Sequence, residues 1–166
     1  LTAVTGTPII TTSQTVGSIF YTPFKGAYTV LATSDASAYY AYNFSQFTLS
    51  MSALSGATAY DVYLAYLSSV GAIIGTSPSW AVGGGSVTIG SASRGTGAGS
   101  AQITRNAAGF YANTVAMNIT NGGTVYAIAA GAGVMVGSVY TASAGAVTCS
   151  VGYSQPSRPT LFTWTG

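Results

Sequence analysis

Apolar and polar residues alternate with a period of two along most of the chain. The clearest stretch is 47–52, where Phe47, Leu49 and Met51 alternate with a threonine and serines. This alternation predicts a half-buried β-strand, and the Val, Ile, Thr, Tyr and Phe that fill such stretches favour a pleated surface. Further strands are predicted at 19–24, 28–32, 39–44, 62–67, 87–89, 115–120, 125–129, 134–140, 147–153 and 161–164.

Turn residues separate these stretches. Asn121-Gly122-Gly123 lies between two predicted strands, and Asn-Gly is the strongest short signal for a hairpin. No long apolar stripe with a helical period is present. About ten short strands with frequent turns predict an all-β fold, either an antiparallel β-sandwich or a jelly-roll-like barrel with long Gly-rich loops. We expect a single domain over 1–166, in which the Gly-rich stretch 83–99 is the one internal boundary that the composition suggests.

Ionisable residues are scarce, and their scarcity excludes several kinds of site. Charged residues make up 4% of the chain, against roughly 25% in an ordinary soluble domain. There is no Glu or His and a single cysteine, so a zinc site and an intramolecular disulfide lack their ligands. The net charge of +2 offers no basic cluster for nucleic acid, and no apolar run is long enough for a membrane-spanning helix. The charged residues are Lys25, Arg94, Arg105, Arg158, Asp35 and Asp61.

Asp35 and Asp61 are the only carboxylates that could form an acid–base pair or bind calcium. A calcium site usually draws on several carboxylates. Asp35 lies in an apparent turn between strands, whereas Asp61 lies inside a strand pattern. We therefore favour structural roles for both, such as an Asx turn or an ion pair with arginine. Lys25, the base that a Ser–Lys dyad would need, lies in a predicted turn.

Two further features have an ordinary structural interpretation. The segment Gly95-Thr96-Gly97-Ala98-Gly99 is similar to a phosphate-binding loop, but neither a helical pattern nor an acidic residue follows it. Cys149 alternates with Val147 and Val151, which predicts a small buried hydrophobe. The sequence therefore predicts no catalytic, cofactor-binding or metal-binding residue.

Tyrosine is the most abundant aromatic residue, with 12 copies. Exposed aromatic clusters can stack on sugars or form protein interfaces. We favour a different interpretation, in which most of these rings fill a core that is short of leucine. The clustered tyrosines are Tyr39, Tyr40, Tyr42, Tyr60, Tyr63 and Tyr66.

The low charge has a consequence for the surface. A lone soluble domain stays dispersed through scattered ionic residues, and this chain has almost none. An uncharged surface suits permanent burial against neighbouring subunits, because no charge has to be desolvated. We therefore expect a structural subunit of an extracellular or virion assembly.

The opening residues carry a more specific likeness. Leu1-Thr2-Ala3-Val4-Thr5-Gly6-Thr7-Pro8 precedes Phe20-Tyr21-Thr22-Pro23-Phe24-Lys25-Gly26. These segments resemble the L-T-x-x-(S/T)-G-T-P and (Y/F)-Y-T-P-(Y/F)-x-G motifs of a β-rich domain of tailed-bacteriophage virion proteins. The likeness covers residues 1–80, whereas a neutral Gly/Ser/Ala stretch at 83–101 replaces the family's arginine-rich middle. Further segments that resemble the family are 39–44, 58–62, 79–80, 135–138 and 162–164.

The resemblance implies a non-enzymatic fibre, spike or decoration module of a bacteriophage virion, an extracellular particle. It implies a homotrimer. We also expect contacts with other virion proteins, and host-surface glycan binding by exposed loops as a second role. The loops that could contact a glycan are 34–38, 83–99 and 121–123. No cofactor, nucleic acid partner or membrane insertion is expected. Because the chain begins with leucine rather than methionine, we expect a processed product or a piece of a longer chain.

Two alternatives remain open. A subunit of a cellular extracellular filament or surface layer would share the same uncharged surface. If it assembles by strand donation, it needs a detached alternating strand, for which 2–12 is the candidate. A carbohydrate-binding module would instead be a monomer that exposes Tyr or Trp in a row.

Overall fold

The computed structural model describes residues 1–6, 14–23, 26–82, 92–95, 99–141 and 143–149. None of these residues is helical, and every strand pairing among them is antiparallel. The predicted all-β fold is therefore confirmed. The described part of the chain contains fifteen strands rather than about ten: β1 Gln14–Val16, β2 Ser18–Tyr21, β3 Tyr28–Ala32, β4 Tyr39–Asn43, β5 Phe47–Ser50, β6 Thr58–Leu67, β7 Gly71–Thr76, β8 Ala81–Val82, β9 Ala92–Ser93, β10 Ile103–Arg105, β11 Tyr111–Asn113, β12 Met117–Asn121, β13 Thr124–Ile128, β14 Val134–Thr141 and β15 Val147–Cys149.

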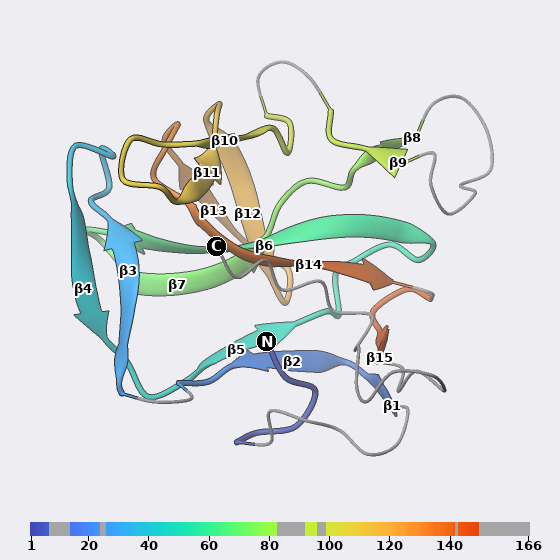
Figure 1. Ribbon diagram of the computed structural model, residues 1–166. Helices are drawn as coiled ribbons and strands as arrows, with labels where there is room; N and C mark the ends of the chain where they lie inside the picture. Colours follow the sequence, from blue (N-terminus) through green and yellow to red (C-terminus); the bar gives the residue numbers. More distant parts are fainter. Residues whose placement is uncertain (7–13, 24–25, 83–91, 96–98, 142, 150–166) are drawn as a thin grey trace.

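A curled sheet of seven strands forms the centre of the molecule, in the order β10-β11-β14-β6-β7-β12-β13 (Figure 1). The remaining strands form two-stranded ribbons: β1–β15, β2–β5, β3–β4 and β8–β9. The strands that precede the Gly-rich stretch 83–99 and those that follow it belong to the same large sheet. The larger strand count arises because several short segments, such as β10 and β11, add three residues each to this sheet.

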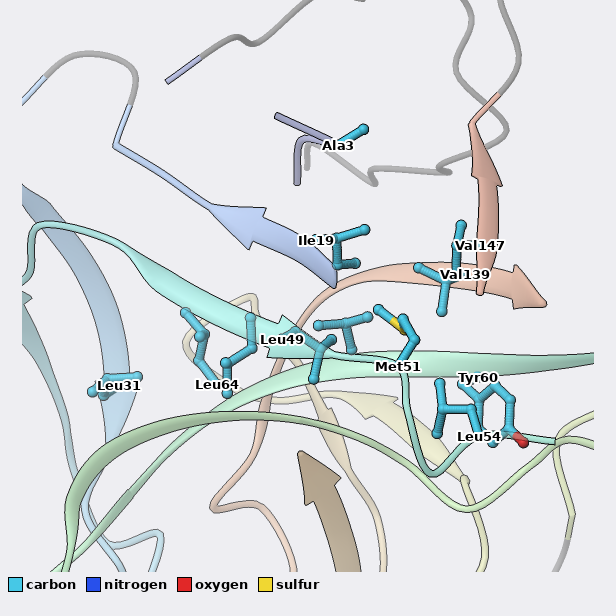
Figure 2. Packing of buried hydrophobic residues seen from close by; sticks show 12 residues of the cluster. Ala3, Ile19, Leu31, Leu49, Met51, Leu54, Tyr60, Leu64, Val139 and Val147 are labelled. Carbon is cyan, nitrogen blue, oxygen red and sulfur yellow. The ribbon is translucent and has the colours of Figure 1, made fainter. Parts of the chain in front are cut away.

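The long central strand β6 is buried on both faces, because alternate side chains of a strand point to opposite sides. Tyr60, Val62 and Leu64 join a first core, which includes Ile19 of β2 and Leu49 of β5. Figure 2 shows Ile19, Leu49 and Leu64 of this core converging between the β2–β5 ribbon and the large sheet. The buried members of the first core are Ala3, Ile19, Leu31, Leu49, Met51, Leu54, Tyr60, Val62, Leu64, Ile74, Val139 and Val147.

The opposite face of β6 contributes Tyr63 and Ala65 to a second core inside the curl of the sheet. Ile119 of β12 packs there against β7, so close to Gly75 that a methyl group at this position would be crowded. A Cβ atom on Gly75 would lie 3.0 Å from the Ile119 side chain. The buried members of the second core are Tyr63, Ala65, Ile73, Met117, Ile119, Ile128 and Ala132.

The hairpin predicted at Asn121-Gly122-Gly123 is confirmed, since β12 pairs with β13 and the register places Asn121 opposite Thr124. Gly122 and Gly123 have φ angles of +56° and +87°, the left-handed values of a type I′ turn. The Asn121 side chain docks this turn onto β5. Its Oδ1 accepts from the Ser50 N–H at 2.9 Å, and its Nδ2 donates to the Thr48 carbonyl at 2.9 Å.

Several sequence predictions fall outside the described residues. They are the strands at 87–89 and 161–164, the end of the strand at 147–153, and the roles of Lys25 and Arg158. The Cys149 backbone belongs to β15 as predicted, whereas the burial of its side chain lies outside the description.

Candidate functional site

The most concentrated group of polar side chains surrounds Asp61 in the middle of β6. Its carboxylate is fully buried, although burying an unpaired charge is strongly unfavourable. Arg94 compensates the charge of this carboxylate through a bidentate contact. Its Nε lies 2.6 Å from Asp61 Oδ2, and its Nη2 lies 2.9 Å from Oδ1. An ion pair with arginine is one of the two structural roles that we expected for the aspartates, and the structure shows it at Asp61.

Neighbouring elements complete the surroundings of this ion pair. Ser138, which faces Asp61 across the β6–β14 ladder, donates its hydroxyl to Oδ1 at 2.6 Å. The Arg94 guanidinium lies over the Trp80 ring, 4.3 Å from its centroid, within the range of a cation–π contact. Trp80 precedes β8 and Arg94 follows β9, and these two strands pair with each other. The ion pair thus fastens the base of the β8–β9 ribbon to the central strand. We call Asp61, Arg94, Trp80 and Ser138 the Asp61 clamp.

Two polar atoms near the clamp have no hydrogen-bond partner among the described residues: the Tyr63 hydroxyl and the Trp80 indole nitrogen. Burial, together with the nearby Asp61 carboxylate, raises the pKa of Tyr63 above its ordinary value. A phenol in this state keeps its proton throughout the physiological pH range.

The clamp is better suited to holding the fold than to chemistry. Both oxygens of Asp61 accept hydrogen bonds from Arg94 or Ser138 within the fold, and the carboxylate is fully buried, so its surface is not presented to a substrate. Arg94 is 26% exposed at its side chain, which leaves the cation as the one charged member of the clamp that reaches the surface.

Asp35, the second carboxylate, lies in the exposed loop 34–38 that joins β3 to β4. Its Oδ1 accepts from the hydroxyls of Thr33 and Ser37, at 2.6 and 2.8 Å, and from the Ser37 backbone N–H at 3.1 Å. These hydrogen bonds, the Thr33 hydroxyl first, lower the pKa of Asp35 to about 2. The predicted Asx turn is confirmed. Asp61 is not part of this turn, because the Asp61 side chain is buried in β6 and pairs with Arg94.

The tyrosines mainly pack within the molecule, as predicted. Tyr60 and Tyr63 are buried. Tyr40, Tyr42 and Tyr66 pack against one another, with ring centroids 6.0 to 6.4 Å apart, and against the first core. Tyr39 stacks on Phe110 and donates its hydroxyl to the Gly131 carbonyl at 3.1 Å.

The loops predicted as glycan contacts differ in how far the structure describes them. Loop 34–38 is held by its own hydrogen bonds around Asp35. In loop 121–123 the Asn121 side chain is engaged by β5, while Gly122 and Gly123 are exposed. Most of 83–99 lies outside the described residues, and the part that follows Gly99 leads into β10 rather than into a helix.

The described surface carries large apolar side chains that sequence reasoning did not single out. Tyr28 is 68% exposed, and Val70 and Val125 are each 57% exposed; Tyr111 and Val4 are exposed to a smaller extent. Few charges surround them, because the described part of the chain contains only Asp35, Asp61, Arg94 and Arg105 as charged side chains. A shallow hollow of about 220 Å³ lies beside β13, lined by Gly99, Ala116, Met117, Asn118, Ala127 and Ile128.

A search for groups of three or more His, Cys, Asp or Glu side chains found none within the described ranges. Over the same residues, no helix is long and apolar enough to span a bilayer. Comparisons of the chain with protein-family models, curated proteins and solved structures found no match.

Proposed function

We propose that the chain is a non-enzymatic structural module of a bacteriophage virion, such as a tail fibre, capsid fibre or decoration protein. It acts by assembling with further copies of itself, as a trimer or a larger oligomer, and with other virion proteins. The virion setting draws on the resemblance of residues 1–80 to β-rich virion domains.

One observation carries the assembly function: the described surface combines exposed large apolar side chains with very few charges. Tyr28, Val70 and Val125 are more than half exposed, and the whole chain has six charged residues. Burying such a surface against a neighbour gains the hydrophobic contribution without desolvating charges. The two carboxylates lend support, because the clamp and the Asx turn engage them within the fold.

The native mass of the soluble chain, measured by light scattering at two concentrations, tests the assembly function. We expect a stable trimer or larger oligomer at both concentrations. A monomer that stays soluble would contradict the proposal, because its uncharged surface would then be exposed to water in the functional state.

A carbohydrate-binding module is the second candidate, and the exposure of Tyr28 favours it. A ring that is 68% exposed can stack on a sugar face. A glycan-binding screen with the native chain and with Tyr28→Ala distinguishes this function. Saturable glycan binding that Tyr28→Ala abolishes would support a carbohydrate-binding function. Thr29→Ala is the control for damage to the strand, because Thr29 is a buried neighbour on the opposite face of β3.

The filament alternative predicts a detached donor strand within 2–12. Thr2 instead pairs with Phe20 of β2 through two backbone hydrogen bonds of 2.7 and 2.8 Å. Ala3 is buried in the first core. The start of that segment is therefore docked on its own chain, which weighs against strand donation by these residues. Residues 7–12 lie outside the described part.

A further inference from the structure

The two edges of the large sheet differ in how they are protected against pairing with another strand. β10, at one edge, has three residues and ends in Arg105. Shortness and a charged side chain are common devices that prevent an edge from pairing. β13, at the other edge, has five residues, Thr-Val-Tyr-Ala-Ile, with no charge and no proline. Among the described strands it pairs with β12 alone.

The hairpin geometry indicates which backbone groups of β13 face outward. The residues that flank a two-residue turn form a hydrogen-bonded pair, and such pairs then alternate along the ladder. The backbone N–H and C=O groups that point toward β12 are therefore those of Thr124, Tyr126 and Ile128. Val125 and Ala127 turn their N–H and C=O groups to the open edge, and both residues are exposed.

We infer that β13 forms a two-fold interface with β13 of a second copy of the chain, paired antiparallel about Tyr126. In this register Val125 lies opposite Ala127 of the second copy, and the four outward N–H groups of the two strands all find carbonyl acceptors. An added strand matches the spacing of this row of donors and acceptors, and an uncharged strand meets its own copy without like-charge repulsion.

The hollow beside β13 supports this occupant. Residues directly opposite each other in an antiparallel pair point to the same face of the sheet. The Val125 side chain of the second copy therefore lies beside Ala127, which lines the hollow together with Ala116 and Asn118. Val125 is 57% exposed in the isolated chain, and this placement covers it with apolar surface.

This pairing rests on the proposed assembly function and names one of its surfaces. A two-fold contact joins copies in pairs, so that an assembly which also has a three-fold interface becomes a hexamer. The native mass should therefore correspond to an even number of chains.

The test compares the native masses of the wild-type chain, Val125→Lys and Ser69→Lys by sedimentation at two concentrations. Ser69 is the control, because it is an exposed polar residue in the turn between β6 and β7 and does not belong to the apolar surface. We expect Val125→Lys to halve the mass and Ser69→Lys to leave it unchanged, with the circular dichroism of all three chains alike.

Each other outcome has a separate meaning. A wild-type monomer overturns the proposed function together with this interface. Three outcomes overturn the β13 interface but not the proposed assembly function. The wild-type assembly has an odd number of chains, Val125→Lys does not alter its mass, or both substitutions reduce its mass.

Amide hydrogen exchange of the wild-type assembly gives a readout that needs no variant. The outward N–H groups of Val125 and Ala127 exchange slowly if they are hydrogen-bonded to a second copy. Rapid exchange of these two amides, beside slow exchange of Tyr126, would overturn the pairing even if the variants failed to fold.

Discussion

Replacing Arg94 by methionine removes the cation that compensates the buried charge of Asp61. The substitution abolishes two of the three hydrogen bonds that the carboxylate accepts, at 2.6 and 2.9 Å, and leaves the Ser138 hydroxyl. Because Asp61 is fully buried, solvent cannot take the place of the guanidinium. Breaking a buried pair in this way costs about 3–5 kcal/mol of stability.

The converse substitution, Asp61→Asn, should cost less. It keeps the size of the side chain and an oxygen for Ser138. It leaves Arg94 without its anion, but Arg94 is 26% exposed and remains over the Trp80 ring. We expect a loss of about 1–3 kcal/mol, the cost of leaving a buried hydrogen-bonding group imperfectly paired. The asymmetry between the two substitutions follows directly from which partner is buried.

Urea unfolding followed by circular dichroism, at one fixed protein concentration, measures both losses. In a thermal scan each kcal/mol corresponds to a shift of roughly 2–4 °C in Tm for a chain of this size. Arg105→Met is the control, because Arg105 is exposed and its Nε donates to a single carbonyl, that of Gly109. It should change stability by no more than about 0.5 kcal/mol. An Arg94→Met loss below about 1 kcal/mol, or a larger loss for Asp61→Asn, would refute the reasoning.

Asp35 and Gly75 offer two further tests. The hydrogen bonds from Thr33 and Ser37 give Asp35 a pKa of about 2, below its unfolded value. Its contribution to stability is therefore complete above the unfolded value and is lost as the pH falls through about 2. An NMR titration measures this midpoint, and a value near the ordinary 3.8 would contradict it. Gly75→Ala places a Cβ 3.0 Å from Ile119 and should cost about 1–3 kcal/mol through overpacking. Gly17→Ala is the control and should be close to neutral, because its Cβ would meet only the Gly145 carbonyl at 3.7 Å. Equal losses of stability for the two substitutions would contradict the packing explanation.

Strands with a local signal could be predicted from the sequence. The range 28–32 coincides with β3, and the Asn-Gly signal marked the β12–β13 turn. β7 was missed, although it is central to the large sheet. Ile73, Ile74, Gly75 and Thr76 are all buried, so both faces of this strand are covered and its sequence has no alternation to detect.

The polar contacts of the candidate site are also of two kinds, local contacts that the sequence predicts and distant contacts that it does not. The contacts of Asp35 come from Thr33 and Ser37, within two residues of it, and a turn of this kind can be predicted from neighbours in the sequence. Asp61 and Arg94 are 33 residues apart. The sequence suggested an ion pair between an arginine and an aspartate, but which of the arginines forms it depends on where β9 ends relative to β6.

The sequence by itself determined the fold class and the uncharged surface, because period-two alternation, turn residues and the near absence of charge are properties of the chain alone. Tertiary structure decided the strand order, the clamp at Asp61 and the contrast between the edges at β10 and β13. These features depend on pairing between segments far apart in sequence. Such pairing is selected by the burial of whole faces of the sheet and leaves no short-range pattern.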